Sequence, residues 1–247
     1  MIILKSHAEI DKMRAANSIV REVLERMAGE VCVGAATGDL DRIAEELIVA
    51  RGAKPAFKGY RGYKSTLCTS VNEEVVHGIP GPRRLNDGDI IGIDCGVFYD
   101  GFYGDMARTF PVGRISDVAQ RLLKVTEEAL HIGIKNARAG NRLFDISAAI
   151  QRHVEAGGFS VVRDFVGHGV GTSLHEDPQI PNFGEAGTGV RLRTGMVLAL
   201  EPMVNAGDWK VKVLDDGWTV ITADRSLSAH FEYSVAITED GVEILGG

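Results

Sequence analysis

Cysteine is scarce in this sequence, and its spacing excludes the sites that depend on it. The 247-residue chain has three cysteines, Cys32, Cys68 and Cys95, and no two of them form a Cys-x-x-Cys pair. An odd number at these intervals provides neither a disulfide framework nor a thiolate zinc site. Free thiols are typical of a reducing compartment, so we expect a cytoplasmic protein.

Long apolar runs and an excess of positive charge are also missing. No stretch approaches the roughly 20 apolar residues of a membrane-spanning helix, and the charge of Lys5 comes too early for a signal peptide. The formal net charge is −7, from 27 basic and 34 acidic side chains, so we expect no basic surface for nucleic acid. These features exclude a membrane protein and a general nucleic-acid binder.

The pattern of apolar residues predicts the same order of elements twice. With 45% hydrophobic residues the chain can bury a sizeable core. A capping box from Ser6 to Glu9 begins the first helix, and Ser116 is placed to begin the third. We expect helices over 6–29, 39–51, 116–139 and 143–156, and strands over 65–71, 89–97, 102–110, 161–166, 196–200 and 230–238.

A short motif repeats at a spacing near 100 residues. Residues 85–94 read LNDGDIIGID, and residues 192–201 read LRTGMVLALE. The match could be coincidence between short apolar strings, but both end in a carboxylate. We interpret it as two related halves, roughly residues 1–114 and 115–247, that meet at a pseudo-twofold axis within one domain. A site at that axis would receive acidic side chains from both halves.

Two aspartates flank a predicted hairpin turn. Asp100-Gly101 is a strong signal for a two-residue turn, and centring the turn there places Asp94 opposite Ala107. Asp105 then lies diagonal to Asp94 on the same face of the ribbon. Carboxylates so close repel each other unless a cation lies between them. The alternative is that both acids are solvated residues near the turn. It fits Asp94 less well, because the apolar run before Asp94 indicates that this residue is buried.

Other candidate ligands follow later in the chain. Glu201 closes the apolar run 196–200, whereas Glu232 lies on the polar face of an alternating strand, which in isolation also fits a solvent-facing position. His168 stands between glycines that leave room for its imidazole; a nucleotide-binding loop would need a following helix that the pattern lacks. His77 lies in an apolar setting where a core histidine is the alternative, and His175 follows His168 by seven residues.

This set of side chains predicts a metal-dependent hydrolase. Carboxylate oxygens with few imidazoles favour Mn²⁺, Fe²⁺ or Co²⁺ over a thiolate-type zinc site. Two such ions bridged by shared carboxylates can hold and ionise a water molecule between them.

The order and spacing of these residues resemble the ligand set of the type I methionine aminopeptidases of bacterial type. The resemblance covers nearly the whole chain and rests on Asp94, Asp105, Gly-His168-Gly, Glu201 in Leu-Glu-Pro-Met-Val, and Glu232. It implies the α+β pita-bread (creatinase/aminopeptidase) fold: two pseudo-twofold-related halves, each helices then strands, around a central curved antiparallel sheet. Residues 1–247 would form a single catalytic domain.

The resemblance also implies a role for each residue. Asp94 would bind one metal, Asp105 and Glu232 would bridge, and His168 and Glu201 would bind the other. Glu201 would also move the proton of the bridging water, with His77 and His175 as the catalytic histidines that contact the substrate. Two divalent ions are expected, Mn²⁺, Fe²⁺ or Co²⁺, with Zn²⁺ as an alternative and a monovalent cation as a further candidate.

Five other residues are matched to the substrate pocket: Tyr60, Tyr63, Trp218, Phe57 and Leu174. The last two depart from the family pattern, in which many relatives have cysteine and phenylalanine, respectively. Pocket size is therefore less well predicted than the reaction.

The implied function is co-translational removal of the N-terminal methionine, with a preference for a small second residue. The expected partners are nascent polypeptide N-termini at the ribosome, with no membrane and no specific nucleic acid, and the expected state is a cytoplasmic monomer. An aminopeptidase of the same fold with another first-residue preference is the main alternative. A partner-binding protein without metals would lack some of these ligands, and a nucleotide-binding protein would need the missing loop-to-helix pattern.

Overall fold

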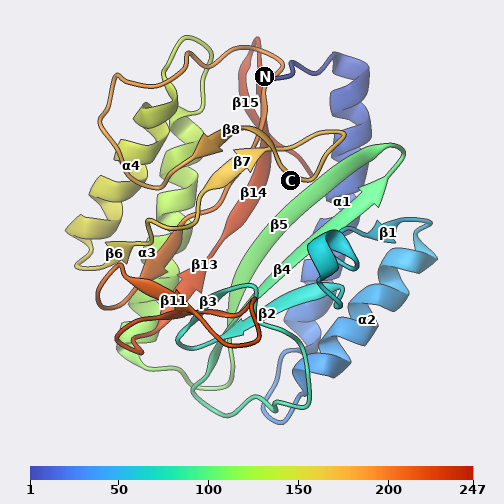
Figure 1. The fold of residues 1–247 in the computed structure, drawn as a ribbon, viewed down its shortest axis with the longest axis vertical. Coiled ribbons are helices and arrows are strands. Elements are labelled where there is room, and N and C mark those ends of the chain that lie inside the picture. The colour runs from blue at the N-terminus through green and yellow to red at the C-terminus, as the bar shows by residue number, and fades with distance from the viewer. Residues whose placement is uncertain (247) are drawn as a thin grey trace.

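Paired helices precede the strands twice along the chain. The computed structural model describes residues 1–246, with helices α1 (His7–Glu30), α2 (Thr37–Ala50), α3 (Asp117–Asn136) and α4 (Leu143–Ala156) (Figure 1). As predicted, the Ser6 and Ser116 side chains accept hydrogen bonds from backbone N–H groups in the first turns of α1 and α3. No helix in residues 1–246 combines the length and the apolar character needed to cross a membrane.

A nine-stranded antiparallel sheet forms the centre of the molecule. Its strands follow the order β1-β4-β5-β14-β9-β7-β8, with β2 paired to β4 and β15 to β14. The bounds are Lys54–Pro55 (β1), Leu67–Val71 (β2), Ile90–Tyr99 (β4), Phe102–Pro111 (β5), Gly167–Gly169 (β7), Glu176–Ile180 (β8), Val197–Leu200 (β9), Glu232–Thr238 (β14) and Gly241–Ile244 (β15).

Two small sheets of three strands each lie beside the central one. One has the order β13-β10-β6 and the other β11-β12-β3. Their bounds are Ser160–Val161 (β6), Met203–Asn205 (β10) and Ser228–His230 (β13), then Glu74–Val76 (β3), Val211–Val213 (β11) and Val220–Thr222 (β12). Between β1 and β2 a short 3₁₀ turn, η1, covers Tyr60–Gly62.

The hairpin of β4 and β5 has the predicted register. Asp100 and Gly101 form the turn with φ of 47° and 86°, the left-handed backbone that a two-residue turn of this type requires. Asp94 pairs with Ala107, and Asp105 pairs with Gly96. Asp94 and Asp105 are therefore diagonal neighbours on one face of the ribbon.

The predicted strand over 161–166 is wrong for most of its length. Only Ser160–Val161 forms a strand, by pairing with Val204 and Asn205 of β10. Arg163 and Asp164 are exposed and have no strand beside them. β-Propensity alone does not make a strand where no neighbour supplies cross-strand contacts.

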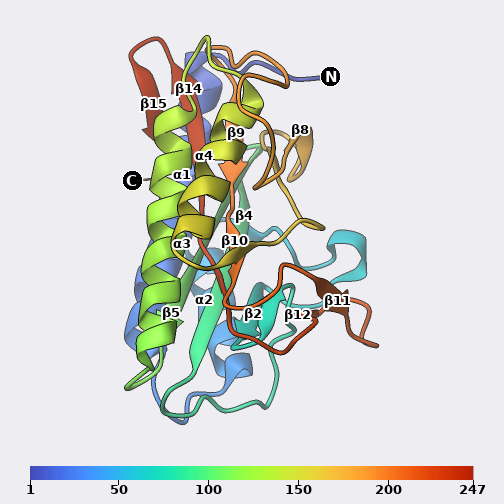
Figure 2. The ribbon, with the colours of Figure 1, turned by 90° about the vertical axis from the view of Figure 1, so that its left-hand side faces the viewer.

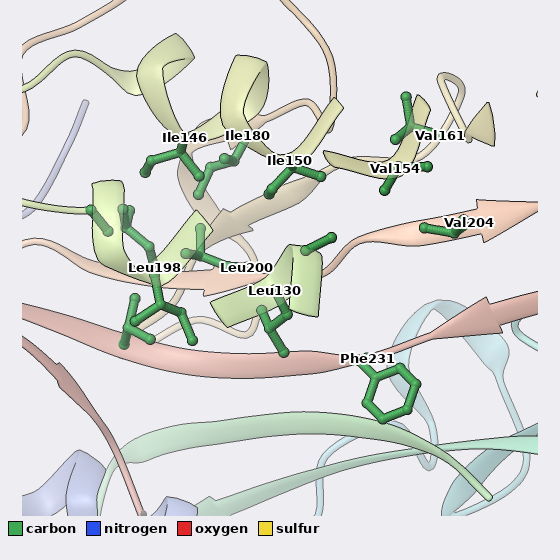
Figure 3. Close-up of a cluster of buried hydrophobic side chains, with 14 of the residues drawn as sticks. Leu130, Ile146, Ile150, Val154, Val161, Ile180, Leu198, Leu200, Val204 and Phe231 are labelled. Atoms are coloured by element: carbon green, nitrogen blue, oxygen red, sulfur yellow. The ribbon is translucent and has the colours of Figure 1, made fainter. Parts of the chain in front are cut away.

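All four helices cover one face of the central sheet. Figure 2 shows them on one side and β8, β11 and β12 on the other. Leu198 and Leu200 of β9 point into the core beneath α3 and α4 (Figure 3). Ile91, Ile93 and Cys95 of β4 pack with α1 and α2. Because side chains alternate along a strand, Asp94 points to the opposite face, away from the helices.

The seam between β5 and β14 joins the two sets of elements. Only two residue pairs are formed there, Glu232 with Ala107 and Tyr233 with Met106. Side chains continue the seam: the Thr109 hydroxyl donates to the His230 carbonyl (2.8 Å) and accepts from the His230 N–H (2.9 Å), and Ser234 Oγ donates to the Asp105 carbonyl (2.9 Å). These three bonds hold the strands that carry Asp105 and Glu232.

Replacing Thr109 with valine should destabilise the protein markedly. Both backbone groups of His230 would stay buried without their partner, which should lower the free energy of unfolding by about 2–3 kcal/mol. Urea unfolding measures this. Thr188→Val is the matched control, because Thr188 is exposed and its hydroxyl donates only to the Glu185 carbonyl of the same loop. Equal effects of the two substitutions would contradict the role given to the seam.

Candidate metal centre and substrate pocket

The five predicted metal ligands come from five adjacent strands of the central sheet. The strand order β4-β5-β14-β9-β7 places side by side the elements that carry them. In that order the residues are Asp94, Asp105, Glu232, Glu201 (directly after β9) and His168. Residues up to 138 positions apart, from Asp94 to Glu232, therefore meet on one face of the sheet.

Strand pairing explains why the acids point the same way. Ala107 pairs with Asp94 on one side and with Glu232 on the other, so the three residues form one row across the sheet. Directly opposite residues present their side chains on the same face. The small methyl group of Ala107 leaves the space between the two acids free, and Asp105 enters that space from two residues away.

His168 turns one ring nitrogen toward the acids. Its Nε2 lies 3.8 Å from Asp105 Oδ2 and 3.6 Å from Glu201 Oε1. Its Nδ1 is 2.8 Å from the Gly169 carbonyl, and a carbonyl only accepts, so we assign the proton to Nδ1. The neutral ring then has its lone pair on Nε2, the arrangement in which histidine binds a metal.

Several buried polar atoms in this cluster have no hydrogen-bond partner. They are Asp94 Oδ1, Asp105 Oδ1, Glu232 Oε1 and, beside them, His230 Nε2. Ligand atoms of Asp105, His168 and Glu232 all lie within 4.8 Å of one another. Buried carboxylate oxygens without partners are costly, and a cation among them would satisfy them. The residues present therefore fit a divalent metal with oxygen ligands.

Burial and mutual repulsion raise the pKa of the acids. Burial raises the pKa of Asp94 to about 7. Burial, followed by the negative charge of neighbouring acids, raises the pKa values of Asp105, Glu201 and Glu232 well above the ordinary range. Such a cluster exchanges protons for a metal ion, because the cation stabilises the ionised form that burial disfavours.

Burial has the opposite effect on the imidazoles. It lowers the pKa of His77 and of His168 to about 4, and the pKa of His175 also falls. These rings are therefore neutral at physiological pH. A neutral histidine can bind a metal or form a hydrogen bond with an amide without adding positive charge to the cavity.

All twelve predicted site residues line one cavity of about 160 Å³. They are the seven ligand and catalytic residues Asp94, Asp105, His168, Glu201, Glu232, His77 and His175, and the five pocket residues Phe57, Tyr60, Tyr63, Leu174 and Trp218. Phe57, Tyr63 and Leu174 belong to one buried apolar cluster. The cavity thus has an acidic end and an apolar end, which suits a ligand with a polar head and an apolar side chain.

The two histidines predicted to be catalytic are held by aromatic neighbours. The His175 ring lies 4.3 Å from the His168 ring, and its Nδ1 is 2.9 Å from the Tyr60 hydroxyl. His77 has φ of 61° and meets the edges of Phe165 at 5.6 Å and Trp218 at 6.4 Å. His77 is therefore placed by packing, and His175 by stacking on the Tyr60 ring at 5.3 Å and by the hydrogen bond to the Tyr60 hydroxyl.

The cavity also includes residues that sequence reasoning missed. Cys68 and Arg61 line it, and the buried His230 lies 3.8 Å from Glu201 and 3.9 Å from Glu232. Alternation along the strand already placed His230 on the face of Glu232, so a signal existed. Cys68 reaches the site because β2 pairs it with Asp94, a long-range pairing without a local signature.

The glycines around His168 serve strand packing. A side chain at Gly167 would meet the Ala199 carbonyl, and one at Gly169 would meet the backbone of Asp177. Because these two glycines have no side chains, β7 fits between β8 and β9. His168 then lies next to the acids. The segment continues into a bend and β8, so it is not a nucleotide-binding loop.

Comparisons with known proteins agree on one family. Residues 11–239 match the model of metallopeptidase family M24. The chain is 58% identical to the methionine aminopeptidase of Clostridium perfringens over 99% of this chain and 98% of that one. It is 55% identical to methionine aminopeptidase 1 of Bacillus subtilis over 99% of each.

Solved structures extend the similarity to the fold. The methionine aminopeptidase of Thermotoga maritima superposes with a TM-score of 0.98 at 49% identity, covering 100% of this chain and 99% of that one. The prolidase of Pyrococcus furiosus, at 24% identity, gives a TM-score of 0.79 and is covered over 65% of its length. The predicted fold class, the α+β pita-bread fold around a curved antiparallel sheet, is confirmed.

The acidic cluster should make the protein stripped of divalent metal less stable at alkaline pH. Folded Asp105, Glu201 and Glu232 hold protons that the unfolded chain has released above about pH 5. Since the folded state binds more protons, its stability falls as pH rises. Above about pH 7, where the histidines are neutral in both states, we therefore expect the free energy of unfolding to fall as pH rises.

Urea unfolding in a chelator measures this loss. Repeating the series with Mn²⁺ is the control, because the metal replaces the protons of the acids and should weaken the decline. Stability that rises with pH in the chelator would contradict these pKa shifts.

Proposed function

The chain belongs to metallopeptidase family M24, and on this premise we propose that it is a methionine aminopeptidase acting on the N-termini of newly made proteins. The single observation that carries the proposal is the cavity in which an acidic cluster adjoins an apolar pocket. The metal site formed by the acids would hold the free α-amine of a peptide, and the apolar end accepts its first side chain. The high identity to methionine aminopeptidases over the full chain supports methionine as that residue.

We assign the metal site to Asp94, Asp105, His168, Glu201 and Glu232. The proposed occupants are two divalent ions, Mn²⁺, Fe²⁺ or Co²⁺, which these five side chains would hold. Bound there, divalent ions supply Lewis acidity and lower the pKa of water toward neutrality.

The protein side chains provide the remaining chemistry. Glu201 lines the cavity beside the other acids, and its carboxylate, ionised when a metal is bound, would take a proton from the attacking water and return it to the leaving amine. His175 and His77 line the same cavity in neutral form, as donors to the scissile amide and to the charge that develops on its oxygen. Tyr60 orients His175 through the hydrogen bond to Nδ1.

The shape of the pocket supports selection of an unbranched apolar side chain. Phe57 packs so closely against Gly96 that any side chain at position 96 would overlap its ring. Tyr63 is held by hydrogen bonds from its hydroxyl to the carbonyls of Leu67 (2.9 Å) and Gly78 (3.0 Å). Trp218 packs edge-on against Tyr63 at 5.0 Å. These fixed walls leave a narrow cavity that a flexible thioether can fill.

The setting of the reaction follows from the substrate. Nascent polypeptides present the N-terminus during synthesis, so we place the protein in the cytoplasm near the ribosome, acting as a monomer. A small second residue is expected, because the acidic end of the cavity is crowded by His77 and His175.

Release of methionine from short peptides tests the proposal. With Mn²⁺ or Co²⁺ added to metal-stripped protein, Met-Ala-Ser should be cleaved, and Met-Lys-Ser should not, as measured by free methionine. Asp94→Asn should reduce kcat/KM by at least about 100-fold, since even residues behind metal ligands contribute roughly 10- to 100-fold.

Asp100→Asn is the matched control for that variant. Asp100 lies in the exposed hairpin turn, so its loss should leave activity near the wild-type level. No release from either peptide, with metal demonstrably bound, would overturn the methionine assignment and favour another first residue.

Substituting Phe57 should alter the choice of first side chain. Phe57→Ala enlarges the pocket, so the ratio of kcat/KM for ethionine-Ala-Ser over Met-Ala-Ser should rise by about 10-fold, the usual effect of room for one methylene group. Phe98→Ala is the control, because Phe98 packs on Tyr103 outside the cavity lining. An unchanged ratio in Phe57→Ala would show that Phe57 does not limit the pocket.

A further inference from the structure

A buried ion pair lies behind the cavity rather than in it. Lys5 Nζ is 2.5 Å from Glu176 Oε2, and the two side chains are 4% and 7% exposed. Within residues 1–246, every other lysine or arginine ion pair has at least one side chain more exposed than this. Taking two charges out of water is costly, and apolar replacements are often at least as stable. Stability alone therefore explains this pair poorly.

Glu176 closes the turn that carries two residues of the cavity. It follows His175 directly and begins β8, and its Oε1 accepts a hydrogen bond from the Ser173 N–H at 3.2 Å. A side chain at Gly171 would overlap both the Glu176 carboxylate and the Lys5 side chain. The carboxylate thus fills the inside of the turn over residues 171–176, and Leu174 and His175 project from the turn into the cavity.

Lys5 is itself fixed to the strands of the metal site. Its backbone N–H donates to the Gly195 carbonyl at 2.7 Å, and the Gly195 N–H donates to the Ile237 carbonyl of β14 at 2.9 Å. Its Nζ also donates to the Ile3 carbonyl at 3.1 Å. The ammonium group is therefore held in a fixed position next to β9 and β14, the strands that position Glu201 and Glu232.

We propose that Lys5 and Glu176 are positioning residues for the peptidase reaction, acting through His175. The buried pair ties the turn over residues 171–176 to the strands of the acidic cluster, so that the His175 ring is held at the distance that the reaction needs. Tyr60 fixes the same ring from the cavity side. The inference rests on the proposed function and assigns these residues no contact with the substrate.

The informative variant removes both charges together. Lys5→Met or Glu176→Gln alone leaves an unpaired buried charge and can unfold the protein. The double variant K5M/E176Q leaves none, so we expect its Tm to stay near that of the wild type. On Met-Ala-Ser with saturating Mn²⁺, kcat should nevertheless fall by about 100-fold, as for a misplacement near 1 Å, with a smaller change in KM.

Two controls separate positioning from a general structural effect. Lys12→Met breaks the exposed pair with Asp100 (3.1 Å) in the same N-terminal region and should keep wild-type kcat. In a His175→Ala background, K5M/E176Q should lower kcat by less than about 3-fold, because residues that act as one unit are not additive. A purely structural role would give the same fold-loss in both backgrounds.

The outcomes distinguish this inference from the proposed function. An active wild type together with wild-type kcat in K5M/E176Q overturns the positioning role alone. The positioning role is also overturned if K5M/E176Q lowers kcat in the His175→Ala background by the same factor as in the wild type. A wild type that releases no methionine with metal bound overturns the proposed function and this inference with it.

Discussion

Four carboxyl groups crowded on one buried face of a sheet are the constraint on which the rest of the structure depends. Asp94, Asp105, Glu201 and Glu232 are all buried enough for their pKa values to rise, and three of them have an oxygen without a partner. Such an arrangement persists only where the surrounding scaffold over-determines it. The helices on the opposite face supply that scaffold through two large apolar cores. The two apolar cores that stabilise the fold lie on one face of the sheet, and the side chains proposed for the reaction lie on the other.

The cavity around the acids is organised by neutral groups. The lowered pKa values of His77, His168 and His175 keep these rings uncharged, so the charges around the cavity are those of the acids, the cations they would bind and Arg61. Aromatic rings then fix the imidazoles and shape the apolar end. Behind this layer, the Thr109 and Ser234 bonds hold the seam, and the Lys5–Glu176 pair holds the turn of His175. Each of these supporting contacts is made by an element that also carries a residue of the proposed reaction.

Much of this arrangement could be predicted from sequence, for a local reason in each case. Asp100-Gly101 specifies a two-residue turn, so the register that sets Asp94 diagonal to Asp105 follows from counting. Ser6 and Ser116 cap the first turns of α1 and α3, so the starts of these two helices could be predicted from the sequence. The strand expected over 161–166 failed because β-propensity needs a neighbouring strand, and the chain provides one only at Val161. Cys68 was missed for the same reason, since its position depends on pairing with a distant strand.

The sequence by itself determined the helices, the hairpin and the list of side chains able to bind metal, because these depend on neighbours a few residues apart. Only the tertiary structure decided that β5 and β14 meet, which places Glu232 in the row of Asp94 through Ala107. The same long-range packing joined Lys5 to Glu176 across 171 positions and enclosed the apolar pocket beside the acids. Contacts of this kind arise when apolar faces of separate elements are buried together, and no local pattern encodes which faces those are.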